Sequence, residues 1–350
     1  MSVTQKQIAE HLGVSQSLVT QSLRDLPRIP EATRLRVKEA ARELGYIAHS
    51  NDAARTLRAR RDGTRPLTQT IGVLMGDFFE GLPLHEVPFY QPLLQGLKAE
   101  AARRDVDLSF FTCQIHRLPR FFVQGGVDGV IGLYNGPIDP ELKKQLSCAL
   151  LRIGDGAPDE WALRPDDRRG IYLATRHLIE LGHRHIAYLG DSRGNETRDL
   201  MYKSRLDGYF QALGDCGLPV SNDLVEAHIG APDHQAGAMG VGRLLDRTRE
   251  FTALVCFNDS SALGAIAELQ RRGLAVPGDV SVTGFDDVSG EGRHDPALTT
   301  VHFDRFEMGR RAVEAICEVA EEGTESEFRG HELMPVRLIE RASSGPKRVV

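Results

Sequence analysis

From Thr70 onward, short runs rich in β-branched and aromatic residues alternate with longer stretches of helical periodicity. The order begins TIGVLMG, YQPLLQGLKAEAARRD, VDLSFFT, GVDGVIGLY and ALLRIG, and a similar series restarts after Gly170 with IYLATRHLIELG and HRHIAYLGD. Strand, helix, strand is the rhythm of a parallel sheet that helices cover on both faces. The repeat therefore predicts an α/β body of two similar, doubly wound parallel-sheet subdomains.

The length and composition bound the class of protein. A chain of 350 residues is too long for one ordinary core, so two or more domains are expected. With 41% hydrophobic and 26% charged residues, the chain does not match the disordered, fibrous or membrane classes. No apolar stretch approaches the ~18 residues of a membrane span, and the amino terminus is polar where a signal peptide is apolar. We expect a cytoplasmic protein with no membrane partner.

Metal and catalytic signatures are missing from the sequence. The five cysteines are widely spaced without a CxxC pair, which predicts reduced core thiols rather than a metal site. The chain has no GxxxxGK[ST], GxSxG or HExxH motif, and no GxGxxG after the first strand. We therefore expect no cofactor and no enzymatic activity.

Charge divides the chain into a basic head and an acidic body. Residues 1–68 carry a net charge of +5, whereas the remaining residues carry −11. The basic head favours a nucleic-acid partner, which the overall charge of −6 would conceal.

The head has the residue spacing of a helix-turn-helix. Thr4 and Gln7 form a capping-box pattern, and Gly13 ends this first helix. Ser15 is a suitable N-cap for a second helix in which Val19 continues the apolar stripe. A third helix follows Pro30, with Leu35 and Val37 among its apolar residues. A three-helix protein-interaction module is the alternative, but the basic charge favours an all-α DNA-binding domain over residues 1–49.

The second helix turns polar side chains outward. Gln16, Ser17 and Gln21 are the candidates for reading base edges, and Gln can form a bidentate pair with adenine. Thr20 and Arg24 are expected to contact the DNA backbone. The predicted DNA-contacting residues of the helices are Thr4, Ser15, Gln16, Ser17, Thr20, Gln21 and Arg24.

Residues 50–69 form a basic, polar linker with too few apolar side chains for a core. Within it, Leu57 stands alone on a short Ala/Arg helical pattern. This pattern predicts a hinge helix that orders on DNA, with Leu57 as a minor-groove wedge and with Arg55 and Arg58 on phosphates. A merely solubilising hinge is the alternative.

Polar residues follow several predicted strands of the body. Ligands in such folds bind beyond the carboxyl ends of the strands, so these residues are candidates for a binding site. Because Asp286 and Asp287 are adjacent, we expect one to accept a hydrogen bond from a ligand and the other to act as a structural cap. The strand-end residues are Asp77, Asn135, Asp155, Asp191, Asn258, Asp259, Asp286 and Asp287.

The whole chain resembles the LacI/GalR family of bacterial transcriptional regulators. VTQKQIAEHLGVSQSLVTQSL resembles the family's helix-turn-helix, and AARTLR resembles its hinge helix. In the body, FYQPLLQGL, HLIELGHRHIAYLG, SRLDGYFQAL, FNDSSALGAIAELQRRGLAVPGDVSVTGFDD and LMPVRLIERASS each resemble a family block in the expected order.

The resemblance implies a homodimeric repressor that binds a pseudopalindromic double-stranded operator. A small polar effector, expected to be a sugar or sugar derivative, would bind in a cleft between periplasmic-binding-protein-like subdomains. These would comprise 70–160 with 301–325 and 161–300 with 326–350, so that LMPVRLIER returns to the second. The residues that the resemblance places around the effector, together with the strand-end Asp155, are Phe89, Tyr90, Asp155, Arg205, Asn258 and Asp286.

Departures from the family pattern leave alternatives open. Gln21 stands where the family commonly has Arg, which argues against an ordinary family operator, and Pro232 stands where relatives often place an aromatic residue over the ligand. A nucleobase-type corepressor is the alternative to a sugar, and the sequence does not decide between inducer and corepressor. More remote alternatives are a periplasmic sugar-binding protein and a sugar-processing enzyme that uses Asp259 and Asp286.

Overall fold

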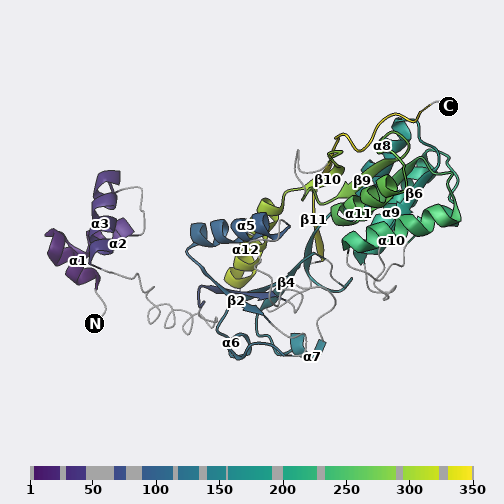
Figure 1. The fold of residues 1–350 in the computed structure, drawn as a ribbon. Helices are drawn as coiled ribbons and strands as arrows, with labels where there is room; N and C mark the ends of the chain where they lie inside the picture. Colours follow the sequence, from purple (N-terminus) through teal and green to yellow (C-terminus); the bar gives the residue numbers. More distant parts are fainter. Residues whose placement is uncertain are drawn as a thin grey trace. The chain divides into compact units, whose positions relative to one another are not determined.

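The computed structural model divides into two compact units, Met1–Pro66 and Leu67–Val350, which we describe separately (Figure 1). None of the helices in the described ranges is both long and apolar enough to cross a bilayer. The structure describes residues 4–23, 29–44, 67–75, 89–112, 117–133, 140–154, 157–190, 200–226, 233–288, 295–322 and 330–348.

The first unit contains three helices around a small core. They are α1 (Gln5–Leu12), α2 (Gln16–Leu23) and α3 (Glu31–Glu43). Ile8, Val19 and Val37, one from each helix, are almost fully buried. Leu35, which the apolar pattern of α3 placed in this core, is instead 60% exposed. The apolar pattern of α3 thus predicted that Val37 is buried, but not that Leu35 faces away from the core.

The second unit begins with a six-stranded sheet in the order β11-β5-β4-β3-β1-β2, and every pairing in it is parallel. Helices α5 (Tyr90–Arg104) and α12 (Arg305–Glu322) pack together over one face, and α6 (Arg120–Val123) and α7 (Pro140–Lys143) lie over the other (Figure 1). The strands are β1 (Thr70–Met75), β2 (Asp107–Thr112), β3 (Gly129–Leu133), β4 (Ala149–Ile153), β5 (Ala162–Pro165) and β11 (His331–Met334).

A second six-stranded sheet has the order β12-β10-β9-β8-β6-β7. Helices α8 (Asp167–Glu180) and α9 (Leu200–Asp215) cover one face, and α10 (Asp233–Arg247) and α11 (Asp259–Arg271) cover the other. The edge strand β12 runs antiparallel to β10, which the prediction of parallel sheets missed. The strands are β6 (Ile186–Leu189), β7 (Val225–Glu226), β8 (Ala253–Cys256), β9 (Ser281–Phe285), β10 (Thr299–Phe303) and β12 (Val336–Ile339).

The chain passes between the two sheets three times, and each passage falls later than the sequence analysis placed it. Residues 162–165 pair in the first sheet as β5, and residues 299–303 pair in the second sheet as β10. The run LMPVRLIER does not return as one strand, because β11 pairs with β5 in the first sheet and only β12 joins the second. Pro335 separates them, and a proline cannot donate to a strand ladder.

Candidate functional site

The α1-turn-α2 geometry follows from three local features of the sequence. The Thr4 side chain accepts from the Gln7 backbone N–H and the Gln7 side chain accepts from that of Thr4, so the capping box forms as predicted. Gly13 adopts the left-handed conformation with φ 64° and ends α1. Ser15 Oγ accepts from the Leu18 backbone N–H at 3.2 Å and caps α2. These features hold the two helices at a short turn.

The outward face of α2 carries the predicted reading residues. Gln16 and Ser17 are exposed, and the half-buried Gln21 donates from Nε2 to Ser17 Oγ at 2.9 Å. Thr20 ties the helices together, because its hydroxyl donates to Gln5 Oε1 on α1 at 2.7 Å. The Thr20 hydroxyl, which we expected to contact the DNA backbone, therefore already donates a hydrogen bond within the first unit.

In the second unit, Arg205 lies at the centre of a buried polar cluster. Arg205 is 3% exposed, and its Nε donates to Asp167 Oδ1 at 2.8 Å. Its Nη1 donates to the Phe257 carbonyl at 2.6 Å, and its Nη2 lies 3.8 Å from Asp286 Oδ1. The guanidinium thus joins α9 to the beginning of α8 and to the carboxyl ends of β8 and β9.

Aromatic rings fix the plane of this guanidinium. Arg205 Cζ lies 3.8 Å from the centroid of the Phe285 ring and 4.5 Å from that of Phe257. Tyr202 stacks on Phe257 with a centroid distance of 4.5 Å. A cation held against aromatic faces is stabilised without being neutralised, so Arg205 remains a charged donor towards Asp286.

The two carboxylates of this region have shifted acidities. Burial raises the pKa of Asp286 to about 7, against the charge of Arg205, which lowers it. Burial likewise raises the pKa of Asp259 to about 6, although the Thr300 hydroxyl donates to this carboxylate. Perturbed carboxylates beside a buried arginine are typical of a functional site.

Asp286 and Asp287 have different surroundings, as the sequence analysis expected of such a pair. Asp287 accepts from Arg341 Nη2 at 2.7 Å, and its Oδ2 lies 2.9 Å from His302 Nδ1. Asp286 is held through its backbone, because Arg305 donates to its carbonyl. Asp287 therefore has a structural role in this arrangement, and the Asp286 carboxylate remains directed towards Arg205.

Three further predicted residues flank the cluster. Asn258 caps α11, since its side chain accepts from the Ser261 N–H at 2.8 Å. Phe89 is half-buried and packs edge-on against Tyr90 at 4.9 Å between centroids. Arg305 Cζ lies 5.5 Å from the Phe89 ring centroid, so Arg305 links Phe89 to the Asp286 loop.

These contacts link Arg205 to Asp286 directly and Phe89 to the Asp286 loop through Arg305, whereas Asn258 is linked only as the neighbour of Phe257, and Tyr90 only through Phe89. Asp167 and Arg305 were not among the predicted residues, although Asp167 lies two residues after the end of β5 and the strand-end rule could have found it. No group of three or more potential metal ligands occurs in the described ranges. The predicted residues outside those ranges are Arg24, Arg55, Leu57, Arg58, Asp77, Asn135, Asp155 and Asp191.

Comparisons with known proteins agree with this division of the chain. The model for bacterial regulatory proteins of the lacI family matches residues 4–49, and the periplasmic binding protein-like domain matches residues 175–344. The transcriptional regulator GalR of Escherichia coli K12 is 31% identical over 328 residues, which cover 91% of this chain and 89% of GalR. The transcriptional repressor PurR of Aliivibrio salmonicida is 30% identical over 328 residues, with coverage of 90% and 91%.

Solved structures show the same fold. The transcriptional regulator CelR in complex with cellobiose has a TM-score of 0.68 and 26% identity, and covers 97% of this chain and 99% of its own. The Lac repressor dimer bound to operator and the anti-inducer ONPF has a TM-score of 0.67 at 22% identity, with coverage of 99% and 100%. The chain is thus a helix-turn-helix DNA-binding regulator with a periplasmic-binding-protein-like body. It belongs to the lacI family of bacterial regulatory proteins.

Proposed function

We propose that this regulator is a repressor whose affinity for its operator is set by a sugar or sugar derivative bound at the Arg205–Asp286 cluster. The observation that carries the proposal is the buried guanidinium of Arg205, 3.8 Å from the Asp286 carboxylate at the carboxyl ends of β8 and β9. Guanidinium N–H groups donate to ligand oxygens, and the carboxylate accepts from ligand hydroxyls. Neighbouring hydroxyls of one sugar ring can satisfy both groups.

A ligand controls such a protein only if it binds two conformations with different affinities. The cluster and the residues beside it come from elements of both sheets, since Asp286 follows β9 and Phe89 is the N-cap residue of α5. A ligand held by both would favour one arrangement of the two sheets. The predicted hinge helix with Leu57 would carry that preference to the DNA-binding unit.

A thermal-shift screen of the full chain tests the effector. We would use hexoses, pentoses, disaccharides, uronates, sugar phosphates and purines. A ligand at 100 times its dissociation constant should stabilise the protein by ~2.7 kcal/mol. A sugar that stabilises the wild type but not Asp286→Asn supports the proposal. Stabilisation by purines alone would favour the nucleobase alternative, and sugar binding that survives Asp286→Asn would rule out this site.

Substitutions in the head should separate sequence reading from general DNA attraction. Gln21→Ala is expected to relax the preference at one base position by ~1–3 kcal/mol, because it removes a candidate bidentate contact. Arg24→Ala is expected to weaken binding to all duplexes about equally and to lower the salt slope. Binding assays on a set of single-base operator variants would measure both. An unchanged preference profile for Gln21→Ala would remove Gln21 from the reading surface.

We also propose that the chain dimerises through the β2 edge of the first sheet. β2 is an edge strand of the first sheet and pairs only with β1 among the described strands. Phe110 on β2 and Phe121 and Val123 on α6 are each more than one-third exposed, and Phe121 stacks on Phe111 at 6.3 Å between centroids. An exposed apolar edge strand favours association, and a second copy covers it symmetrically. A pseudopalindromic operator requires such a pair.

Phe121→Asp should therefore weaken dimerisation by at least about tenfold, because it places a charge in an apolar interface. Leu333→Asp is the matched control, since Leu333 is 51% exposed on β11, at the opposite edge of the same sheet. Sedimentation velocity over a dilution series measures both variants. Equal dissociation of the two variants would contradict this interface.

A further inference from the structure

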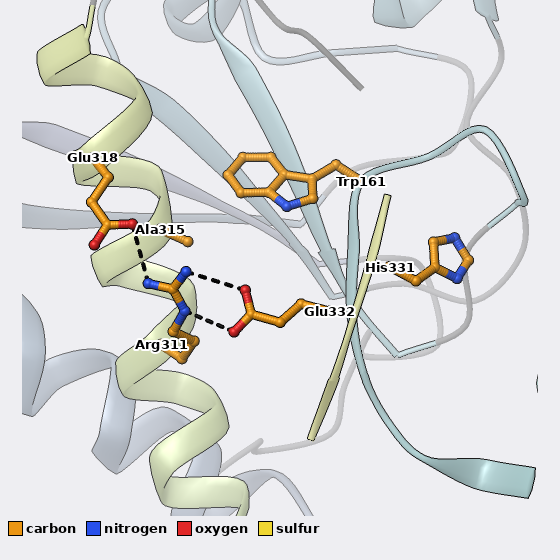
Figure 2. Close-up of a pocket in the computed structure, with 6 residues that line it drawn as sticks. All are labelled: Trp161, Arg311, Ala315, Glu318, His331 and Glu332. Carbon is orange, nitrogen blue, oxygen red and sulfur yellow. Dashed lines mark hydrogen bonds and ion pairs between the residues drawn. The ribbon is translucent and has the colours of Figure 1, made fainter. Parts of the chain in front are cut away.

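A separate cavity of about 300 Å³ lies between α12 and the β5–β11 edge of the first sheet. Figure 2 shows Arg311 and Glu318 on α12 facing Glu332 on β11, with the Trp161 indole above them. None of the lining residues belongs to the Arg205–Asp286 cluster. The six lining residues are Trp161, Arg311, Ala315, Glu318, His331 and Glu332.

The indole N–H of Trp161 is a hydrogen-bond donor on the wall of this cavity. Trp161 is 8% exposed, and its Nε1 has no hydrogen-bond partner among the described residues. Figure 2 shows this nitrogen turned towards the space beside Glu332. Because this N–H faces the cavity, it can donate to an acceptor atom of a ligand bound there.

The opposite wall is rich in acceptors. Arg311 forms a two-bond pair with Glu332, at 2.8 and 3.2 Å, and its Nη1 donates to Glu318 Oε2 at 3.2 Å and Glu314 Oε2 at 3.2 Å. Arg311 thus faces three carboxylates, of which Glu314 also accepts from Arg104. Glu318 and Glu332 still leave the cavity wall with a net negative charge. Glu318 and Glu332 are 45% and 41% exposed, so their remaining lone pairs can accept from a ligand.

These two walls restrict the chemistry of a ligand. An anion could accept from the indole, but the carboxylates would repel it. An amine cation could donate to the carboxylates, but it has no acceptor for the indole N–H. A hydroxyl group both accepts and donates, so an uncharged compound with several hydroxyls satisfies both walls. We propose that this cavity is a second small-molecule site, which binds an uncharged polyhydroxyl compound independently of the Arg205–Asp286 cluster.

The site lies on the segments that pass between the two sheets. Trp161 precedes β5, which leads to Asp167, and Arg311 lies on α12, which begins with Arg305. Glu332 lies on β11, which ends one residue before Pro335. A ligand in this cavity therefore contacts the same segments that position Asp167 and Arg305 in the first cluster.

The test uses the intrinsic fluorescence of Trp161, the sole tryptophan of the chain. The full-length protein is titrated separately with myo-inositol, sorbitol and D-glucose, and with spermidine and inorganic phosphate as charged comparisons. We expect a saturable change in emission with at least one of the three polyols and none with the charged compounds. A change with spermidine or phosphate alone, or with none of the five, overturns the proposal.

Variants then locate the signal. Glu318→Gln should weaken polyol binding by about tenfold through loss of a charged acceptor, whereas Glu180→Gln, an exposed carboxylate on α8, should leave it unchanged. Calorimetry with Trp161→Phe, which keeps an aromatic ring but removes the N–H, should show a similar loss. Asp286→Asn should retain the signal. A signal that survives Glu318→Gln but disappears in Asp286→Asn would belong to the first cluster and would overturn the second site.

Discussion

Replacing Arg205 with alanine is expected to lower the free energy of unfolding by about 3–5 kcal/mol. The substitution leaves the buried carboxylate of Asp167 with fewer donors and removes the donor to the Phe257 carbonyl. It also empties the space between the Phe285 and Phe257 rings. Urea denaturation of the wild type and the variant measures the difference.

Arg271→Ala provides the comparison for this variant. Arg271 is 70% exposed and pairs with Glu268 on the surface of α11, and such pairs contribute about 0–1 kcal/mol. If Arg205→Ala costs no more than Arg271→Ala, the cluster does not hold the two strand ends together. Arg205→Lys should be intermediate, because lysine keeps the charge but loses the planar fork.

Asp286→Asn is expected to weaken effector binding by about tenfold or more, because the amide replaces a charged acceptor with a neutral one. In the wild type, hydroxyl groups of the bound effector donate to the Asp286 carboxylate. These hydrogen bonds favour the charged form of the carboxylate. Since burial raises the pKa of Asp286 to about 7, effector affinity should increase as the pH rises from 6 to 8. Calorimetry at these pH values should show proton release on binding in the wild type but not in the variant.

The same pKa predicts a pH dependence of stability. The unfolded chain releases this proton near pH 4, whereas the folded chain retains it to about pH 7. The folded state therefore loses stability as the pH rises from about 4 through 7, and Asp286→Asn avoids this loss. At pH 8 the variant should be more stable than the wild type by about 1–3 kcal/mol, and the difference should shrink towards pH 4. A constant difference across this range would contradict the assignment of the pKa.

Local patterns were the most predictable part of the molecule. The capping box at Thr4, the left-handed Gly13 and the cap at Ser15 each depend on residues within four positions, and each forms as expected. The alternation of strand and helix patterns predicted the two sheets, because the spacing of apolar residues indicates which face of each element is buried. The antiparallel pairing of β12 was missed because it depends on a partner strand, β10, more than thirty positions away.

The chemistry of the candidate site was less predictable for the same reason. The sequence placed Arg205 and Asp286 in one site only through family resemblance. The contacts that define their environment join residues far apart in the chain, such as Arg205 with Asp167 and Arg305 with Asp286. Asn258 shows the converse, since the residue predicted to meet a ligand uses its side-chain oxygen to cap α11. Its role towards an effector stays a prediction.

A two-stage binding experiment tests whether one ligand site controls DNA binding. The full-length protein first selects duplexes from a random pool, and its affinity for the selected duplex is then measured with and without the sugar found in the thermal-shift screen. We predict a pseudopalindromic site whose affinity changes about 5- to 150-fold with the sugar in the wild type, and does not change in Asp286→Asn. Selection that enriches no sequence, or an operator affinity that the bound sugar leaves unchanged, would show that this ligand site does not control DNA binding.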